Sequence, residues 1–109
     1  MAKKIKIAIP TDDEATISPY FGGSRGFIVL TINDSGIIRT EMRWNRFSDI
    51  LTSKHGNYYN IYDCQAVLVN VIGSCHCQRL DNAKKEVIRT DEILITKAVF
   101  GYLESFSCI

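Results

Sequence analysis

The sequence predicts a small α/β domain built on a mixed β-sheet. Two strand-like segments in the N-terminal half flank a turn sequence, which predicts an antiparallel hairpin. The nearly continuous apolar run Ala66–Ile72 is typical of a strand that is covered on both faces. Helical and strand-like patterns then alternate, which favours a right-handed parallel βαβ unit. Because domains usually contain about 100–150 residues, we expect a single domain spanning residues 1–109.

The first half of the chain predicts three strands. Polar and apolar residues alternate over Lys4–Ile9, and Pro10 is expected to end this first strand. Phe27–Ile32 and Ile37–Trp44 are rich in β-branched residues, and the turn sequence Asn33–Gly36 joins them. These segments therefore predict one strand followed by a hairpin.

The second half predicts a short helix, two strands and two longer helices. A loop over residues 45–56 and a short helix at Asn57–Asp63 are expected before the Ala66–Ile72 strand. The side chains of this helix expected to face inward are Tyr58, Ile61 and Tyr62. Ser74 is the predicted N-cap of a crossover helix. A strand at Glu86–Thr90 and a last helix follow. The positions whose helical spacing defines one packed face are Leu80, Ala83, Lys84 and Val87 in the first helix, and Ala98, Val99, Tyr102, Leu103 and Phe106 in the second.

Composition and charge exclude several classes of function. The chain is 46% hydrophobic and 23% charged, which is typical of a globular protein with a full core. Its net charge of +1 is not the strongly positive charge that is typical of a nucleic-acid-binding protein. No apolar run is long enough for a membrane span or a signal segment, so we expect a cytoplasmic protein with no membrane partner. In that compartment the four cysteines are expected to be reduced thiols.

The candidate chemistry lies in two loops that follow strands. Ligands of open α/β sheets bind at the carboxyl ends of parallel strands, beside helix N-termini. Gly73–Cys77 follows the buried strand, and Thr11–Gly26 follows the first strand. If these two strands are parallel neighbours, the two loops face each other.

Cys75, His76 and Cys77 place two thiols and an imidazole at the start of the predicted helix, where the thiolate form that binds soft metals is favoured. A closed zinc site is not expected, because no second ligand pair completes it. Cys64 precedes the buried strand and is expected about 25 Å away, since a strand rises ~3.3 Å per residue. Cys108 remains a weak candidate. The alternative interpretation is that these cysteines are only small residues in a helical turn.

The loop after the first strand offers a second set of candidate residues. Glycines at 22, 23 and 26 would allow a backbone to approach an anionic ligand, and Arg25 would supply positive charge. The pattern matches neither a dinucleotide-binding fingerprint nor a P-loop. The acidic residues at 12–14 are expected to form a solvated turn.

Several of these segments resemble one known family in their joint order. The runs Lys6–Asp13, Ile17–Gly22 and Phe27–Val29, then Ala66–Gly73 with its helix, look like the dinitrogenase iron–molybdenum cofactor biosynthesis family, the NifX/NifB C-terminal-like domain. The resemblance implies a ribonuclease H-like three-layer α/β/α fold with a mixed, mostly five-stranded sheet.

The resemblance also implies a non-enzymatic domain that binds or carries an iron–sulfur or iron–molybdenum type cluster. The family commonly has His where this chain has Tyr20, and a Gly-rich turn where this chain has Ser74–Cys77. The expected metal ligands are thus Cys75, His76 and Cys77. The residues expected to line the cofactor site with them are Tyr20, Gly22, Arg25, Gly73 and Ser74.

The expected partners are the cluster itself or a cluster-delivery protein, and the hairpin edge offers a surface for a homodimer. Two alternatives stay open. One is a metal-free interaction or regulatory module on the same fold, and the other is a thiol oxidoreductase.

Overall fold

The computed structural model describes residues 4–19, 21, 24–44 and 61–107, together with their side chains except at positions 75 and 105–107. Five strands form one mixed sheet in the order β3-β2-β1-β4-β5, and two helices complete the elements of this part of the chain. The bounds are β1 Ile5–Thr11, β2 Gly26–Asn33, β3 Gly36–Trp44, β4 Ala66–Val69, α2 Ser74–Asn82, β5 Glu86–Arg89 and α3 Ile95–Ser107. The predicted small α/β domain with a five-stranded mixed sheet is confirmed.

The hairpin lies where the sequence predicts it. β2 pairs antiparallel with both β1 and β3. In the turn, the Asn33 side-chain oxygen accepts a hydrogen bond from the Ser35 backbone N–H at 2.8 Å, and Gly36 has a φ of 115°. That φ favours glycine, so the turn residues and the register of the hairpin agree.

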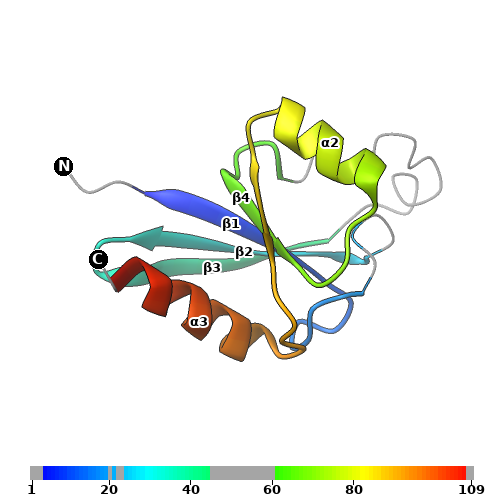
Figure 1. Ribbon diagram of the computed structural model, residues 1–109. Coiled ribbons are helices and arrows are strands. Elements are labelled where there is room, and N and C mark those ends of the chain that lie inside the picture. Colours follow the sequence, from blue (N-terminus) through cyan, green and yellow to red (C-terminus); the bar gives the residue numbers. More distant parts are fainter. Residues whose placement is uncertain (1–3, 20, 22–23, 45–60, 108–109) are drawn as a thin grey trace.

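The two helices lie on opposite faces of the sheet, as Figure 1 shows with α2 above and α3 below. Alternate residues of each strand supply two separate cores. The core under α3 is composed of Ile7, Ile9, Ile17, Ile28, Leu30, Ile32, Ala66, Leu68, Ile95, Ala98 and Val99. The core under α2 is composed of Ala8, Phe21, Phe27, Val29, Ile61, Cys64, Val67, Val69, Ile72 and Leu80. The central strands are thus covered on both faces.

β1 continues through Pro10 to Thr11, so the expectation that Pro10 ends the strand is wrong. The Lys6 carbonyl accepts a hydrogen bond from the Gln65 N–H at 2.9 Å, so the backbone groups of Lys6 face the side of β4. Every second residue of a strand faces the same side, and the backbone of Pro10 therefore faces β4 as well. Proline has no N–H to continue that ladder. The parallel pairing accordingly covers only Ile7 with Ala66 and Ala8 with Val67.

Both ends of α2 differ from the prediction. The Cys77 N–H donates to the Gly73 carbonyl at 3.0 Å, which makes Gly73 the N-cap and Ser74 the first helical residue. The helix ends at Asn82, and Lys84 adopts a φ of 61° while the Lys85 N–H bonds back to the Leu80 carbonyl. Ala83 and Lys84 are therefore exposed beyond the helix instead of packing with Leu80.

The remaining segments agree with the prediction only in part. The predicted strand Ala66–Ile72 is shorter, ending at Val69. The predicted loop at 45–56 and most of the predicted helix at 57–63 lie outside the described residues. At the end of that segment Ile61 is buried as expected, but Tyr62 is 77% exposed. Neither helix of the described ranges is long and apolar enough to cross a membrane.

Candidate functional site

The candidate site lies where the direction of the chain through the sheet reverses. β1 and β4 are parallel neighbours, which is the condition for the loops that follow them to face each other. From β1 the chain continues to β2 on one side, whereas from β4 it continues through α2 to β5 on the other. In open α/β sheets, ligands bind at such a switch point, beyond the carboxyl ends of the strands. We refer to this region beyond the ends of β1 and β4 as the crevice.

The loop that follows β1 and the first turn of α2 meet at this crevice. The ring of Phe21 lies 5.5 Å from the His76 imidazole, measured between ring centroids, with an angle of 58° between their planes. Phe21 also packs edge-on against Phe27 at 5.7 Å and is 2% exposed. The buried phenyl ring thus fixes the position of His76, and the prediction that the two loops face each other is confirmed.

The first turn of α2 distributes its three donor positions around the helix axis. Successive residues of an α-helix are about 100° apart, so positions 75 and 77 lie about 200° apart. Cys77 packs partly buried against the core under α2, in which Leu80 is fully buried. His76 is half-buried. Positions 76 and 77 therefore flank the inward side of the helix, whereas position 75 falls on its outer side.

Burial, with a smaller contribution from the positive charge of Arg79, lowers the pKa of His76 below its ordinary value. The imidazole is therefore neutral near pH 7. A neutral imidazole is the form that coordinates metal ions.

The acidic residues after β1 form a tight turn. The Asp13 carboxylate accepts hydrogen bonds from the backbone N–H groups of Ala15 (2.9 Å) and Thr16 (2.8 Å) and from the Thr16 hydroxyl. These bonds lower the pKa of Asp13 to about 2. The Asp12 carboxylate accepts a bond from the Arg25 backbone N–H at 2.8 Å and so ties the start of the loop to its end. As predicted, these carboxylates build an exposed turn.

The same loop is also fixed to the segment before α3. The Ile17 N–H donates to the Ile93 carbonyl at 2.8 Å, and the Ile95 N–H donates to the Ala15 carbonyl at 3.0 Å. Large apolar residues remain exposed at this end of the sheet; Val71 is 64% and Ile93 is 66% exposed, and Leu94 and Trp44 are also exposed. The crevice is therefore bordered by an apolar surface on the side of β4 and β5.

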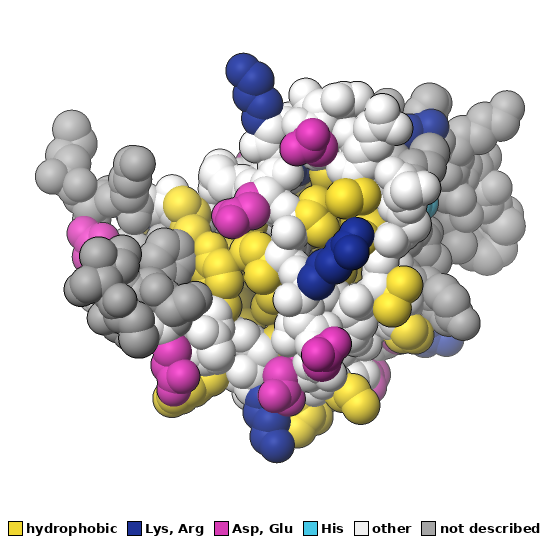
Figure 2. Space-filling model, in the orientation of Figure 1, with side chains coloured by type: hydrophobic (Ala, Val, Ile, Leu, Met, Phe, Trp, Pro, Cys, Tyr) yellow, Lys and Arg dark blue, Asp and Glu magenta, His cyan; other side chains and the backbone are white. Residues whose placement is uncertain are grey.

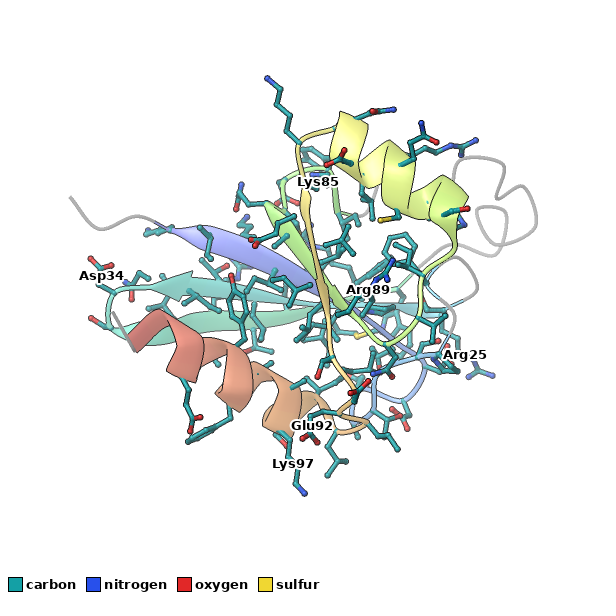
Figure 3. The ribbon with its side chains drawn as sticks, viewed as in Figure 1. Arg25, Asp34, Lys85, Arg89, Glu92 and Lys97 are labelled. Carbon is teal, nitrogen blue, oxygen red and sulfur yellow. The ribbon has the colours of Figure 1, made fainter. Side chains whose placement is uncertain are left out.

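The other residues predicted for the site are either exposed or lie outside the described part of the chain. Gly73 and Ser74 are exposed at the start of α2. Arg25 is exposed, and Figure 3 shows its side chain pointing away from the body of the protein at the same end as the start of α2. Tyr20 and Gly22 lie outside the described residues, as does the side chain of Cys75. Within the described side chains, no three His, Cys, Asp or Glu residues gather as a metal site.

Cys64 belongs to the core and not to this crevice. It is 1% exposed, and burial raises the pKa of its thiol to about 11. Next to it, the Asp63 carboxylate accepts hydrogen bonds from Lys6 Nζ (2.9 Å) and from both terminal nitrogens of Arg43 (2.6 and 3.0 Å). These cations hold the pKa of Asp63 well below its ordinary value. The segment before β4 is thereby fixed across β1 and β3.

Sequence reasoning missed Phe21 as a residue of the site. The available signal was an aromatic residue in a loop otherwise rich in Gly and Ser. Such a residue is usually buried, but its contact partner cannot be read from the loop alone.

Several solved structures have the same fold. PH0822 superposes with a TM-score of 0.80 at 19% identity, covering 93% of this chain and 90% of that one. MJ0327 from Methanocaldococcus jannaschii has a TM-score of 0.75 at 18% identity, covering 94% and 91%. The apo form of the orange protein from Desulfovibrio gigas has a TM-score of 0.71 at 17% identity, covering 92% and 88%. At these identities the similarity establishes the fold alone.

No curated protein matches the chain as a relative. The family described as dinitrogenase iron–molybdenum cofactor matches residues 3–105, which is nearly the whole chain. The family suggested by the short motifs of the sequence is thereby confirmed, and the chain belongs to the dinitrogenase iron–molybdenum cofactor family.

Proposed function

We propose that this protein binds a metal cluster of the iron–sulfur or iron–molybdenum type at the crevice between β1 and β4, and carries it as cargo without catalysing a reaction. The observation that carries the proposal is the contact of Phe21 with His76. It brings a nitrogen donor, and the thiol that follows it in α2, to the switch point of the sheet. Membership of a family named for the iron–molybdenum cofactor supports this cargo.

The donor set suits such a cargo. Thiolates and imidazoles are the ligands that hold iron–sulfur clusters and soft metals. His76 and Cys77 flank the inward side of α2, so we propose them as the first ligands. Position 75 lies about 200° from position 77 in a regular helix, so Cys75 joins them only when the first turn opens. That turn has no side-chain cap, because Gly73 occupies the N-cap.

The strand order and the helix on each face also support the ribonuclease H-like three-layer α/β/α fold, which we propose as the finer fold class. The three segments around the crevice, the loop after β1, the start of α2 and the loop before α3, would then enclose the cargo. Tyr20, Gly22, Arg25, Gly73 and Ser74 belong to these segments or adjoin them, and we retain them as candidates for contacts to the cargo.

A cluster-delivery protein is the partner that we propose for the exposed apolar rim. Val71 and Ile93 are each about two-thirds exposed beside the crevice. Large apolar side chains exposed next to a site are typical of protein-docking surfaces. A partner docked there would reach the crevice directly.

The test is anaerobic reconstitution of the purified protein with iron and sulfide, with and without molybdate, followed by absorbance spectroscopy and elemental analysis. We expect uptake by the wild type and at least about a tenfold loss of affinity in His76→Gln and Cys77→Ser, because each change removes a ligand. Cys75→Ser tests whether the first turn opens.

Cys64→Ala is the matched control, since this buried thiol lies in the core. It should take up as much metal as the wild type. Absence of metal uptake by the wild type would refute the proposal, as would uptake that the His76 and Cys77 substitutions leave unchanged.

A further inference from the structure

The edge of the sheet formed by β5 is open in the described part of the chain. β5 is the last strand of the sheet and pairs only with β4. The Glu86 N–H donates to Gln65 and the Thr90 N–H donates to Val69, so the even-numbered residues face β4. The backbone N–H and C=O groups of Val87 and Arg89 therefore point to the open side, where they can pair with another strand.

A groove with both apolar and polar side chains in its wall runs beside this edge, between β5 and α3. It has a volume of about 270 Å³, and Leu68 and Ile88 contribute apolar side chains to its wall. Figure 1 views the sheet from this edge, and Figure 2 shows apolar side chains exposed in a hollow on the same face. The groove and the unpaired backbone together have the form of a site for an added β-strand.

A glycine of α3 lines this groove. Gly101 lies inside the helix, and a Cβ atom added there would meet no atom of the described residues within 4 Å. Glycine within a helix destabilises the helix relative to alanine, and no contact within the described part of the chain requires a glycine at this position. The absence of a side chain leaves room beside β5 for part of a second molecule.

Charges around β5 indicate which molecule fits. The basic residues Lys84 and Lys85 precede the strand, and the acidic residues Asp91 and Glu92 follow it. The Lys85 ammonium also donates to the carbonyls of Tyr62 (3.0 Å) and Cys64 (2.6 Å), so Lys84 is the basic residue whose charge is more available to a partner. Figure 3 shows Lys85 at one end of β5 and Glu92 at the other. A second copy of β5 placed antiparallel brings the basic end of each strand to the acidic end of the other.

We propose that two copies of this protein associate through β5, antiparallel about a two-fold axis, to form one continuous sheet. The geometry of antiparallel pairing is satisfied by the register in which the two Ile88 residues lie opposite each other at the two-fold axis. This register sets Val87 opposite the partner's Arg89, so that the outward backbone groups of each pair exchange hydrogen bonds. The two Ile88 side chains meet on the α3 face, beside the grooves.

Neighbouring registers are unfavourable. Centring on Val87 sets Lys85 opposite Arg89, and centring on Arg89 sets the two Arg89 side chains opposite each other. The hairpin edge, which the sequence suggested for a dimer, is also less suitable. One side of β3 carries Arg39, Glu41 and Arg43, which are engaged in ion pairs, and charged edge strands resist pairing.

Sedimentation equilibrium from micromolar to millimolar concentrations tests the proposal. We expect the wild type to show a reversible monomer–dimer equilibrium. Arg89→Pro removes an outward N–H but no bond to β4, and should weaken association at least about tenfold. Gly101→Trp should weaken it similarly by filling the groove. Gly101→Ala is the matched control for the loss of glycine and should dimerise more strongly than Gly101→Trp.

A charge swap tests the orientation of the two strands. Glu92→Lys brings Lys84 opposite a lysine and should weaken the dimer, whereas Lys84→Glu combined with Glu92→Lys should restore it. Both positions are exposed, so the monomer is expected to fold in each variant.

Amide hydrogen exchange of the wild type provides a readout that needs no variant. The N–H groups of Val87 and Arg89 should become protected as concentration rises, whereas that of Ile88 is protected throughout. A wild type that is monomeric at millimolar concentration overturns the proposal. So does a dimer that Arg89→Pro leaves unchanged, or one in which Val87 and Arg89 exchange equally fast at all concentrations.

Discussion

The phenyl ring of Phe21 lies 5.5 Å from the imidazole of His76, and this contact joins the two halves of the candidate site. Phe21 belongs to the loop after β1, whereas His76 belongs to α2, which follows β4. Since these strands are parallel neighbours, the contact closes one side of the crevice at their carboxyl ends.

The first prediction concerns this contact. Phe21→Ala should lower the free energy of unfolding by about 3–4 kcal/mol, because it removes a buried aromatic side chain. It should also raise the pKa of His76 toward its ordinary value, since burial is the main cause of its depression. NMR titration in a His55→Gln background, where His76 is the only histidine, measures that pKa.

Phe21→Leu is the control that keeps an apolar side chain at this position, and it should lower the free energy of unfolding by only about 1 kcal/mol. A His76 pKa that is the same in wild type and Phe21→Ala would show that the ring does not shield the imidazole.

The second prediction concerns Asp63, whose carboxylate is bound by Lys6 and Arg43. Asp63→Asn should lower the free energy of unfolding by about 2 kcal/mol at pH 7, which is the usual contribution of hydrogen bonds to a partly exposed charged group. Because the pKa of Asp63 is lower in the folded than in the unfolded state, its stabilisation is present above the unfolded pKa. It should decline progressively as the pH falls below about 4, and disappear only below the pKa of the folded state.

Chemical denaturation at several pH values measures this dependence, which should be shallower in Asp63→Asn. Asp34→Asn, in the exposed hairpin turn, is the control and should leave the dependence as in the wild type. Equal stability of Asp63→Asn and wild type at pH 7 would exclude a structural role for the ion pairs.

The third prediction concerns the turn after β1. The amide resonance of Thr16 should titrate with a midpoint near pH 2, because its N–H donates to Asp13 and the pKa of that carboxyl is about 2. The Asp13→Ala variant should lose this titration and exchange the Thr16 amide faster. Glu14→Gln should keep both properties. A midpoint in the ordinary range of an aspartate would contradict the turn geometry.

The fourth prediction concerns the reactivity of the buried cysteine. Cys64 should react with iodoacetamide at pH 8 only as fast as the protein unfolds, since its thiol is 1% exposed and its pKa is raised to about 11. Peptide mapping by mass spectrometry after timed alkylation measures the rate. Modification of Cys64 as rapid as that of a free cysteine would mean that the core under α2 opens readily.

The fifth prediction compares two glycines given the same substitution. Gly101→Ala should raise the free energy of unfolding by about 1 kcal/mol, because the helix gains a better residue and the new Cβ meets nothing. Gly36→Ala should lower it by about 1 kcal/mol, because the φ of 115° is strained for alanine. Equal signs for the two changes would contradict one of these backbone assignments.

The hairpin and the buried strand could be predicted because their information is local. The turn Asn33–Gly36 and the alternation around it specify β2 and β3 without reference to the rest of the chain. The parallel placement of β1 beside β4 could be expected only as a condition for the site. It became definite in the structure, which pairs Ile7 with Ala66.

The details of α2 and of the site could not be predicted, because they depend on contacts between distant segments. No glycine marks the end of α2, since Lys84 adopts the left-handed conformation that glycine usually supplies. Because Cys75, His76 and Cys77 are adjacent in the sequence, they were expected to bind the same metal site. A helix that begins at Ser74 instead distributes these positions around its axis. Phe21 acquires its role only once the sheet is assembled.

Pro10 gives the sheet a mechanical property. Because the pairing of β1 with β4 is limited to Ile7–Ala66 and Ala8–Val67, the narrowest seam of the sheet runs between them. On one side lies the hairpin half, with β1, β2 and β3, and on the other lies the half with β4, α2 and β5. A force that separates these halves would part the sheet at this seam first, and would draw Phe21 away from His76. Any cargo held there would thus lie at the line of the β-sheet that has the fewest paired residues.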